Sequence, residues 1–142
     1  FAGAMGCVQQ MPSVFRRYAM DYNRDGKKDP WSIEDCIGII ARFMHQKGWK
    51  NGKQVAVPAH YKGKRFTKLK TGYKHRYTLT TLKKYGVTPK TTFNRPKTAL
   101  IKLHNTHRDE LWLGAKNFTV LTRYNASSNY GMAIYKIAES LR

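Results

Sequence analysis

The chain of 142 residues is long enough for one compact domain, and its 41% hydrophobic content excludes a disordered chain. Lys and Arg total 27 against 8 Asp and Glu, a net charge of +19 that favours a polyanionic partner: nucleic acid, cell-wall polymer or anionic lipid. No apolar run is long enough to cross a bilayer and the start lacks a signal peptide, so any anchor or export signal is expected outside this chain.

Two helices on either side of a polar loop are predicted in the first 50 residues. The first follows Pro12, which suits the first turn of a helix, and its apolar residues recur at helical spacing: Val14, Phe15, Tyr18 and Ala19. The second has Ser32 as N-cap, Asp35 three residues later and Gly48 as C-cap. Its expected buried stripe is Ile33, Cys36, Ile37, Ile40, Ala41 and Met44.

The loop between these helices, residues 21–32 (DYNRDGKKDPWS), follows the spacing of a calcium-binding loop. Oxygen atoms at alternating positions would wrap a hard cation, with Gly26 at the sharp turn. The candidate ligands are Asp21, Asn23, Asp25, the Lys27 carbonyl, Asp29 and Ser32. Ser32 stands where a bidentate Glu is usual, and nearby cations oppose a second positive charge, which weakens the site. The sequence therefore predicts a structural Ca²⁺, with a metal-free Asx-rich turn as the alternative.

Cys7 and Cys36 are the two cysteines, and their spacing is not of the zinc-binding type. One disulfide could form in an oxidising compartment. Two buried thiols are the simpler expectation, and the sequence alone favours them.

Short β-prone runs and one short helix are predicted between residues 51 and 110. The extended runs are QVAVPAHY (54–61), KRFTKL (64–69) and TALIKLH (98–104), and the helix is TLTTLKKYG (78–86). Helices return at 117–124 and 130–142, the second expected to turn Met132, Ile134, Tyr135, Ala138 and Leu141 toward a core. The pattern predicts an α+β fold with a small, basic, antiparallel β subdomain inserted between helical parts.

No complete catalytic constellation is visible in the sequence. Glu34, Asp109, Glu110 and Glu139 lack neighbours that would raise their pKa values for general-acid catalysis, and the five His residues are scattered. The turn RYNASSNY (123–130) combines Tyr and Asn, which sugar-binding clefts use for stacking on the ring and for hydrogen bonds to hydroxyl or acetamido groups. Ordinary helix packing around a polar turn explains the same residues.

Three ordered segments resemble the membrane-bound lytic murein transglycosylase B family. Residues 1–13 (FAGAMGCVQQMPS) look like its F-x-G-A-M-G-x-x-Q-F-M-P-S signature, with Gln10 where the family has Phe. Residues 18–49 are similar to its calcium loop and following helix, and residues 117–138 resemble its closing segment. Residues 51–110 match only loosely and are more basic than the family pattern.

The resemblance implies the following fold and activity. A partial lysozyme-like helical core would consist of residues 1–50, with an EF-hand-like loop at 21–32, and residues 111–142; the β subdomain would be 51–110. Such enzymes cleave the β-1,4 bond between N-acetylmuramic acid and N-acetylglucosamine. One Glu acts as acid and then as base, so that the muramoyl 6-hydroxyl closes a 1,6-anhydro ring. In the family this Glu precedes the first motif, so it is expected upstream of Phe1 and this chain alone is expected to be inactive.

The residues carried over by the resemblance are substrate-binding and metal-binding residues. Gln9, Tyr124, Asn125 and Tyr130 would bind the glycan strand, with the opening and closing motifs forming one wall of a groove. The loop residues named above would hold Ca²⁺. The implied partners are peptidoglycan strands and the N-terminal segment of the same enzyme as a separate chain. The implied location is the periplasm, with an outer-membrane lipoprotein as one full-length form and a membrane anchor only outside this chain.

Two other functions remain open. One is a non-catalytic module that binds peptidoglycan or another polyanion through the basic β subdomain. The other is a nucleic-acid-binding domain; it rests on charge alone, and because no recognised nucleic-acid motif is present, nucleic acid is not the expected partner.

Overall fold

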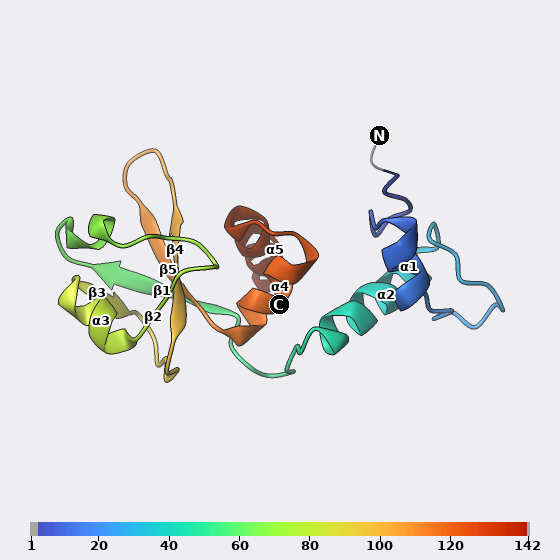
Figure 1. Cartoon of the computed structure of the whole chain (residues 1–142), viewed down its shortest axis with the longest axis horizontal. Helices are drawn as coiled ribbons and strands as arrows, with labels where there is room; N and C mark the ends of the chain where they lie inside the picture. Colours follow the sequence, from blue (N-terminus) through green and yellow to red (C-terminus); the bar gives the residue numbers. More distant parts are fainter. Residues whose placement is uncertain (1–2, 142) are drawn as a thin grey trace. The chain divides into compact units, whose positions relative to one another are not determined.

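The computed structural model describes residues 3–141 and divides the chain into two compact units, residues 1–49 and residues 50–142 (Figure 1). Phe1 and Ala2 of the opening motif and Arg142 of the last expected segment lie outside the described residues. The second unit contains both the expected β subdomain and the expected C-terminal helical part. No helix within residues 3–141 has the length and apolar character that spanning a bilayer requires.

The first unit is built on α1 (Pro12–Tyr18) and α2 (Ile33–Gln46). The Tyr18 ring packs edge-on against Phe43 with ring centroids 4.9 Å apart. The Arg42 guanidinium donates to the carbonyl of Ala19, just after α1 ends. Buried apolar side chains come from both helices and from the opening segment: Val8, Tyr18, Ala19, Cys36, Ile39 and Phe43.

The predicted apolar stripe of α2 is only partly correct: Cys36 is buried and Ile40 and Met44 are half-buried, but the other members are exposed. Ile33 and Ile37 are 69% and 56% exposed, whereas the buried residues are Asp35, Cys36, Gly38, Ile39 and Phe43. The polar loop packs on this other face, because a Cβ on Gly38 would lie 2.7 Å from the Tyr22 Cβ. Close approach of the loop, rather than the size of the apolar side chains, therefore selects the buried face.

The expectation of two free thiols is also wrong, because Cys7 and Cys36 form a disulfide with their Cα atoms 6.3 Å apart. Gly6 has a φ of 67°, and a Cβ there would overlap the Pro30 carbonyl oxygen. The Cys7 N–H donates to that same oxygen at 3.0 Å. The glycine thus lets the opening segment pack against the end of the loop, which brings the two sulfurs together.

A five-stranded antiparallel sheet with strand order β2-β4-β5-β1-β3 forms the centre of the second unit (Figure 1). Its strands are β1 (Ala56–Tyr61), β2 (Arg76–Tyr77), β3 (Val87–Pro89), β4 (Thr98–Leu103) and β5 (Glu110–Gly114). Its helices are the 3-10 helix η1 (Arg65–Lys68), α3 (Leu79–Lys84), α4 (Lys116–Tyr124) and α5 (Ser128–Ser140). The predicted strand at 64–69 is therefore wrong: a 3-10 turn buries Phe66 and leaves its basic neighbours exposed.

Both faces of the sheet are covered, as the alternation of side chains along each strand requires. One face packs with η1 and α3 around Val57, Leu82, Leu100, Leu111 and Leu113. The other packs with α4 and α5 around Ala56, Ala99, Ile101, Phe118 and Met132.

The expected core face of α5 is only partly correct. Met132 is buried and Tyr135 is half-buried against Trp112, whereas Ile134 and Leu141 are 38% and 82% exposed and Ala138 is also exposed. Gly131 packs on the Phe118 ring, which fixes the face through residues 131, 132 and 135.

Candidate functional site

The turn between α4 and α5 brings Tyr124, Asn125 and Tyr130 together. Asn125 ends α4 in an extended conformation, and the Ser127 hydroxyl caps α5 by accepting the N–H of Tyr130 at 3.2 Å. The rings of Tyr124 and Tyr130 stack with an interplanar angle of 7° and centroids 6.4 Å apart. The sequence correctly predicted this cluster as a local turn, because both caps lie within it.

This turn offers aromatic surface and neutral hydrogen-bonding groups. Burial, followed by the neighbouring Tyr130, raises the pKa of the Tyr124 phenol, so the hydroxyl remains protonated at neutral pH. The Asn125 side chain is exposed, and its amide offers both a donor and an acceptor. The sequence analysis did not include Tyr73, whose N–H donates to the Ser128 hydroxyl at 3.0 Å and so holds the loop before β2 against this turn.

Gln9 belongs to the first unit and has an unusual backbone conformation. Its φ is 47°, a left-handed value that non-glycine residues seldom adopt, and its exposed side chain donates to the Gly6 carbonyl at 2.9 Å. The next residue, Gln10, is 7% exposed, and its Oε1 has no hydrogen-bond partner among the described residues. Of the four predicted glycan-binding residues, three thus share one turn and Gln9 lies in the other unit.

Within the predicted calcium loop, side-chain oxygens accept backbone N–H groups. Asp21 accepts from Asp25 and Gly26, Asn23 accepts from Asp25, and Asp25 accepts from Lys27. Among residues 3–141, no three His, Cys, Asp or Glu side chains are grouped as metal ligands. The donor set is nevertheless oxygen only, which is what Ca²⁺ requires.

Asp35 holds this loop, a role that the sequence did not predict. Its carboxylate is fully buried and accepts the backbone N–H groups of Tyr22, Asn23 and Asp29. Ser32, the predicted twelfth ligand, caps α2 by accepting the N–H of Asp35, as its N-cap role predicts. In the sequence, Asp35 stands three residues after the Ser32 N-cap, which suggests only a role in capping the helix. The loop that folds back onto its carboxylate gives no local signal in the sequence.

The carboxylate of Asp35 should make the stability of the first unit depend on pH. The hydrogen bond from the Asp29 N–H is the largest cause that lowers the Asp35 pKa below its ordinary value of 3.8; burial opposes it, and the N–H groups of Tyr22 and Asn23 lower it further. A depressed folded-state pKa adds stability above the unfolded value, and this stability is lost as pH falls through the folded value.

We therefore expect Asp35→Asn to be less stable than the wild type at neutral pH, with a difference that shrinks below about pH 4. Urea unfolding across this pH range, compared with the exposed control Glu34→Gln, measures the effect. A difference that stays constant down to about pH 2 would contradict it.

Glu110 does not have the pKa shift of a general acid either. Burial alone would raise the pKa of Glu110, but hydrogen bonds from Lys136, Trp112 and Asn105 outweigh it and lower the pKa. The two carboxyl groups with a resolved pKa shift, Asp35 and Glu110, are thus both shifted downward. A general acid needs the opposite shift.

Comparison with known proteins identifies relatives along almost the whole chain. The family described as "Transglycosylase SLT domain" matches residues 1–139. Membrane-bound lytic murein transglycosylase B from Escherichia coli (strain K12) is 36% identical over 142 residues, which are 99% of this chain and 38% of that protein. The chain thus spans less than half the length of this relative.

Solved structures show the same fold. The Escherichia coli lytic transglycosylase Slt35, in complex with bulgecin A, matches 97% of this chain and 43% of its own with a TM-score of 0.91 and 36% identity. The same enzyme in complex with calcium gives a TM-score of 0.90 at 36% identity, over 97% of this chain and 44% of that one. SltB3 from Pseudomonas aeruginosa, in complex with NAG-anhNAM-pentapeptide, is 28% identical with a TM-score of 0.74, over 93% of this chain and 36% of that one.

Proposed function

The chain belongs to the transglycosylase SLT domain family, and we propose that it is the C-terminal part of a lytic transglycosylase that cleaves murein glycan strands. The observation that supports this activity is the coincidence of the family match with the Tyr124–Tyr130 stack beside Asn125. Stacked phenols and an exposed amide suit the apolar ring faces and acetamido groups of a glycan.

In this proposal the described residues bind the strand and another segment does the proton transfer. Tyr124, Asn125 and Tyr130 contact the sugars, together with Gln9 on the opening motif. The general acid in this proposal is a Glu upstream of Phe1, as the family resemblance implies, and the lowered pKa values of Asp35 and Glu110 agree with this assignment. That Glu protonates the leaving oxygen of the β-1,4 bond between N-acetylmuramic acid and N-acetylglucosamine. It then takes the proton of the muramoyl 6-hydroxyl, which bonds to its own anomeric carbon and forms a 1,6-anhydromuramoyl end. Its segment is a partner of this chain, within the same polypeptide or as a separate one.

Binding to peptide-free murein glycan strands tests the role of the tyrosines. We expect Tyr130→Ala to weaken binding about fivefold, because loss of one stacked ring costs about 1 kcal/mol. Tyr130→Phe should retain most of the affinity, since it keeps the ring. The matched control is Tyr85→Ala on the α3 side of the sheet, where no glycan contact is proposed. Equal weakening by both alanine variants would refute the assignment.

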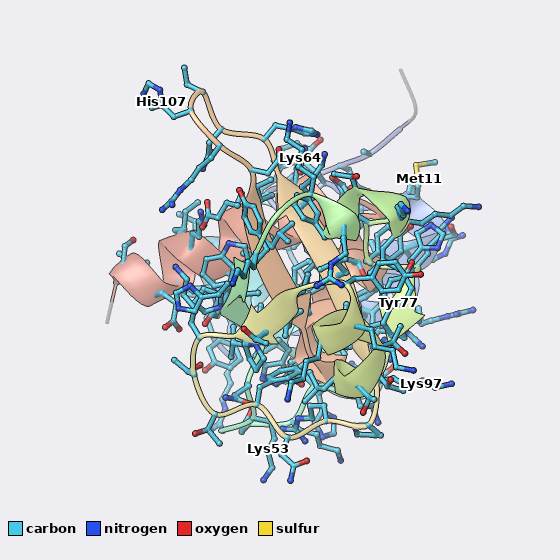
Figure 2. All side chains as sticks on the ribbon, turned by 90° about the vertical axis from the view of Figure 1, so that its left-hand side faces the viewer. Met11, Lys53, Lys64, Tyr77, Lys97 and His107 are labelled. Carbon is cyan, nitrogen blue, oxygen red and sulfur yellow. A yellow bond between two sulfur atoms is a disulfide. The ribbon has the colours of Figure 1, made fainter. Side chains whose placement is uncertain are left out.

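A second candidate function follows from the charge of the second unit. Residues 50–108 contain no Asp or Glu, and Figure 2 shows Lys53, Lys64 and Lys97 reaching outward from the ribbon. This favours the non-catalytic peptidoglycan- or polyanion-binding module as the alternative. The two functions separate when the chain is joined to the upstream segment and incubated with sacculi: release of anhydromuropeptides supports the enzyme, and binding without release supports the module.

We propose that the loop of residues 21–32 binds a structural Ca²⁺ through Asp21, Asn23, Asp25, the Lys27 carbonyl and Asp29. The support is its oxygen-only donor set, its turn with Arg24 at φ 63° and Gly26 at φ 86°, and the calcium complex of the related Slt35. Besides Ser32, which also caps α2, the carboxylate of Asp35 is a second candidate for the closing ligand, because the loop folds directly onto it.

Calcium should stabilise the first unit against unfolding. With a Kd of about 1 mM, typical of weak extracellular sites, about 10 mM Ca²⁺ adds about 1.4 kcal/mol to the free energy of unfolding. We expect a calcium-dependent rise in Tm that is lost in Asp25→Ala and is not reproduced by Mg²⁺, which demands a tighter octahedral site. If Ca²⁺ stabilised Asp25→Ala as much as the wild type, calcium would not bind at this loop.

We propose the periplasm as the location of the protein, because murein is found there and the Cys7–Cys36 disulfide requires an oxidising compartment. A lipid anchor, as the name of the membrane-bound relative suggests, would be supplied by sequence outside this chain.

A further inference from the structure

The sheet of the second unit divides at one end, between β1 and β5. The pairing of these strands ends at Ala59 and Leu111. Beyond that point β1 continues with β3 while β5 continues with β4, so the two strands diverge. A hydrogen bond from the Tyr61 hydroxyl to the Asp109 carbonyl, 3.0 Å long, crosses the gap.

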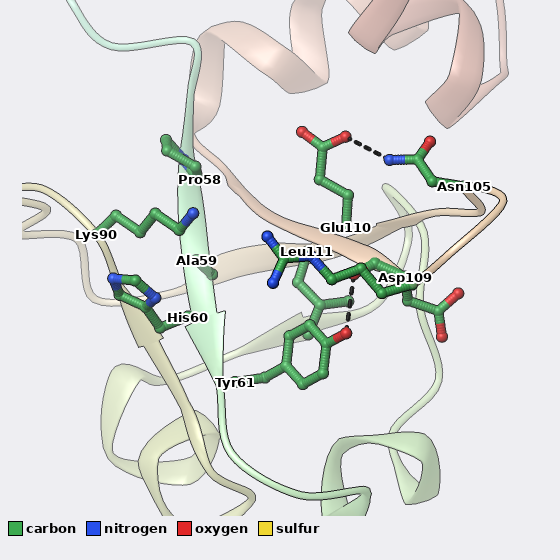
Figure 3. A pocket seen from close by; sticks show the side chains of 10 residues that line it. Pro58, Ala59, His60, Tyr61, Lys90, Asn105, Asp109, Glu110 and Leu111 are labelled. Atoms are coloured by element: carbon green, nitrogen blue, oxygen red, sulfur yellow. Dashed lines mark hydrogen bonds between the residues drawn. The ribbon is translucent and has the colours of Figure 1, made fainter.

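A cavity of about 410 Å³ lies between the diverging ends of β1 and β5, a place called the fork below (Figure 3). This volume lies in the range of small-molecule and peptide side-chain sites. Pro58, Leu111 and the Tyr61 ring give it apolar surface, and Figure 3 shows the side chains of Lys90 and His60 on its β1 side. Arg108, from the hairpin between β4 and β5, also lines it.

The acidic groups of this cavity are paired with cations, whereas two of its basic groups have no acidic partner among the described residues. Asp109 already pairs with Lys102 at 3.6 Å, and Glu110 pairs with Lys136 at 3.1 Å. Lys90 and Arg108 form no ion pair with an Asp or Glu of residues 3–141.

The carboxylates are therefore neutralised by neighbours, and two cations remain to attract a ligand. Their field is reinforced by residues 50–108, which carry no acidic group at all. The cavity is suited to an anion.

We propose that this cavity binds a carboxylate-bearing peptide, namely the peptide stem attached to murein; this inference rests on the proposed function. Arg108 and Lys90 pair with the carboxylate, and the guanidinium provides bidentate geometry. The diverging edges of β1 and β5 provide main-chain groups for the amides of an extended peptide. The apolar walls fit peptide side chains, whereas a free phosphate would use neither the strand edges nor these walls. The site would place the peptides of a strand on the sheet while its sugars lie at the Tyr124 turn.

NMR titration of the 142-residue chain with a sugar-free murein tetrapeptide tests the proposal. We expect chemical-shift changes centred on His60 and Leu111, and a Kd at least fivefold weaker in the double variant Lys90→Gln, Arg108→Gln. The matched control, Lys84→Gln with Lys97→Gln, removes the same charge from exposed positions outside the cavity and should leave Kd unchanged. The tetrapeptide with its carboxylates amidated should bind at least fivefold more weakly.

Three results would overturn the inference: shift changes away from the fork, equal weakening in the control variant, or full displacement of the peptide by an equal concentration of inorganic phosphate. A parallel titration with peptide-free glycan strands separates this inference from the proposed function. If the glycan fails to bind while the peptide binds at the fork, the glycan assignment falls and the peptide site stands. If the glycan binds and the peptide does not, the opposite holds.

Discussion

Reduction of the Cys7–Cys36 disulfide should destabilise the first unit strongly. The two residues are 29 apart in sequence, and closing a loop of this length in the unfolded chain corresponds to about 3.6 kcal/mol. A unit of this size has a small core and a small total stability, so this loss is a large fraction of it. We expect hydrogen exchange of α1 and α2 to accelerate sharply when reductant is added, while the strands of the second unit remain protected.

The matched control for that experiment is the double variant Cys7→Ser, Cys36→Ser. It should show the fast exchange of the reduced protein with or without reductant. Because the disulfide fastens the opening segment to the helix that follows the predicted calcium loop, reduction should also weaken the proposed stabilisation by calcium. Unchanged exchange of α1 and α2 after complete reduction, confirmed by thiol titration, would contradict the prediction.

Replacing Phe118 with Ala should destabilise the second unit by about 3 to 5 kcal/mol, the usual cost of deleting a fully buried Phe ring. Phe118 is 0% exposed and lies between two glycines. A Cβ on Gly114 would lie 2.9 Å from the Phe118 ring, and one on Gly131 would lie 3.1 Å from it. Because neither glycine has a side chain that could move into the space that the ring vacates, the cavity stays open.

Urea unfolding followed by circular dichroism measures this loss. Phe118→Leu, which keeps most of the apolar volume, should cost less than Phe118→Ala. Because Phe118 supports α4 and α5, the alanine variant should also bind glycan strands more weakly, through disorder of the Tyr124 turn. A loss below about 1 kcal/mol would mean that α5 collapses onto the sheet.

Local patterns in the sequence predicted much of the fold. The Ser32 cap, the extended runs that form β1 and β4, and the two closing helices were all predicted at nearly their observed positions. The α+β class and the family resemblance are confirmed by the comparisons. These features depend on residues close together in the chain or on motifs read as a whole.

The errors concern contacts between distant residues. The buried face of α2 depends on the fit of Tyr22 over Gly38, and the disulfide depends on the approach of Gly6 to Pro30. Neither is encoded in the periodicity of one segment. The contacts of Asp35 with the loop were not predicted for the same reason. The cavity at the fork can be found only once the register of β1 and β5 is known. The glycan-binding and calcium-binding roles remain predictions.

The absence of Asp and Glu from residues 50–108 has a consequence for how the protein would be purified. Mild acid cannot change the charge of this stretch by protonating carboxylates, because it contains none. Retention on a cation-exchange resin should therefore persist below neutrality, and elution should be governed by ionic strength rather than by acidity.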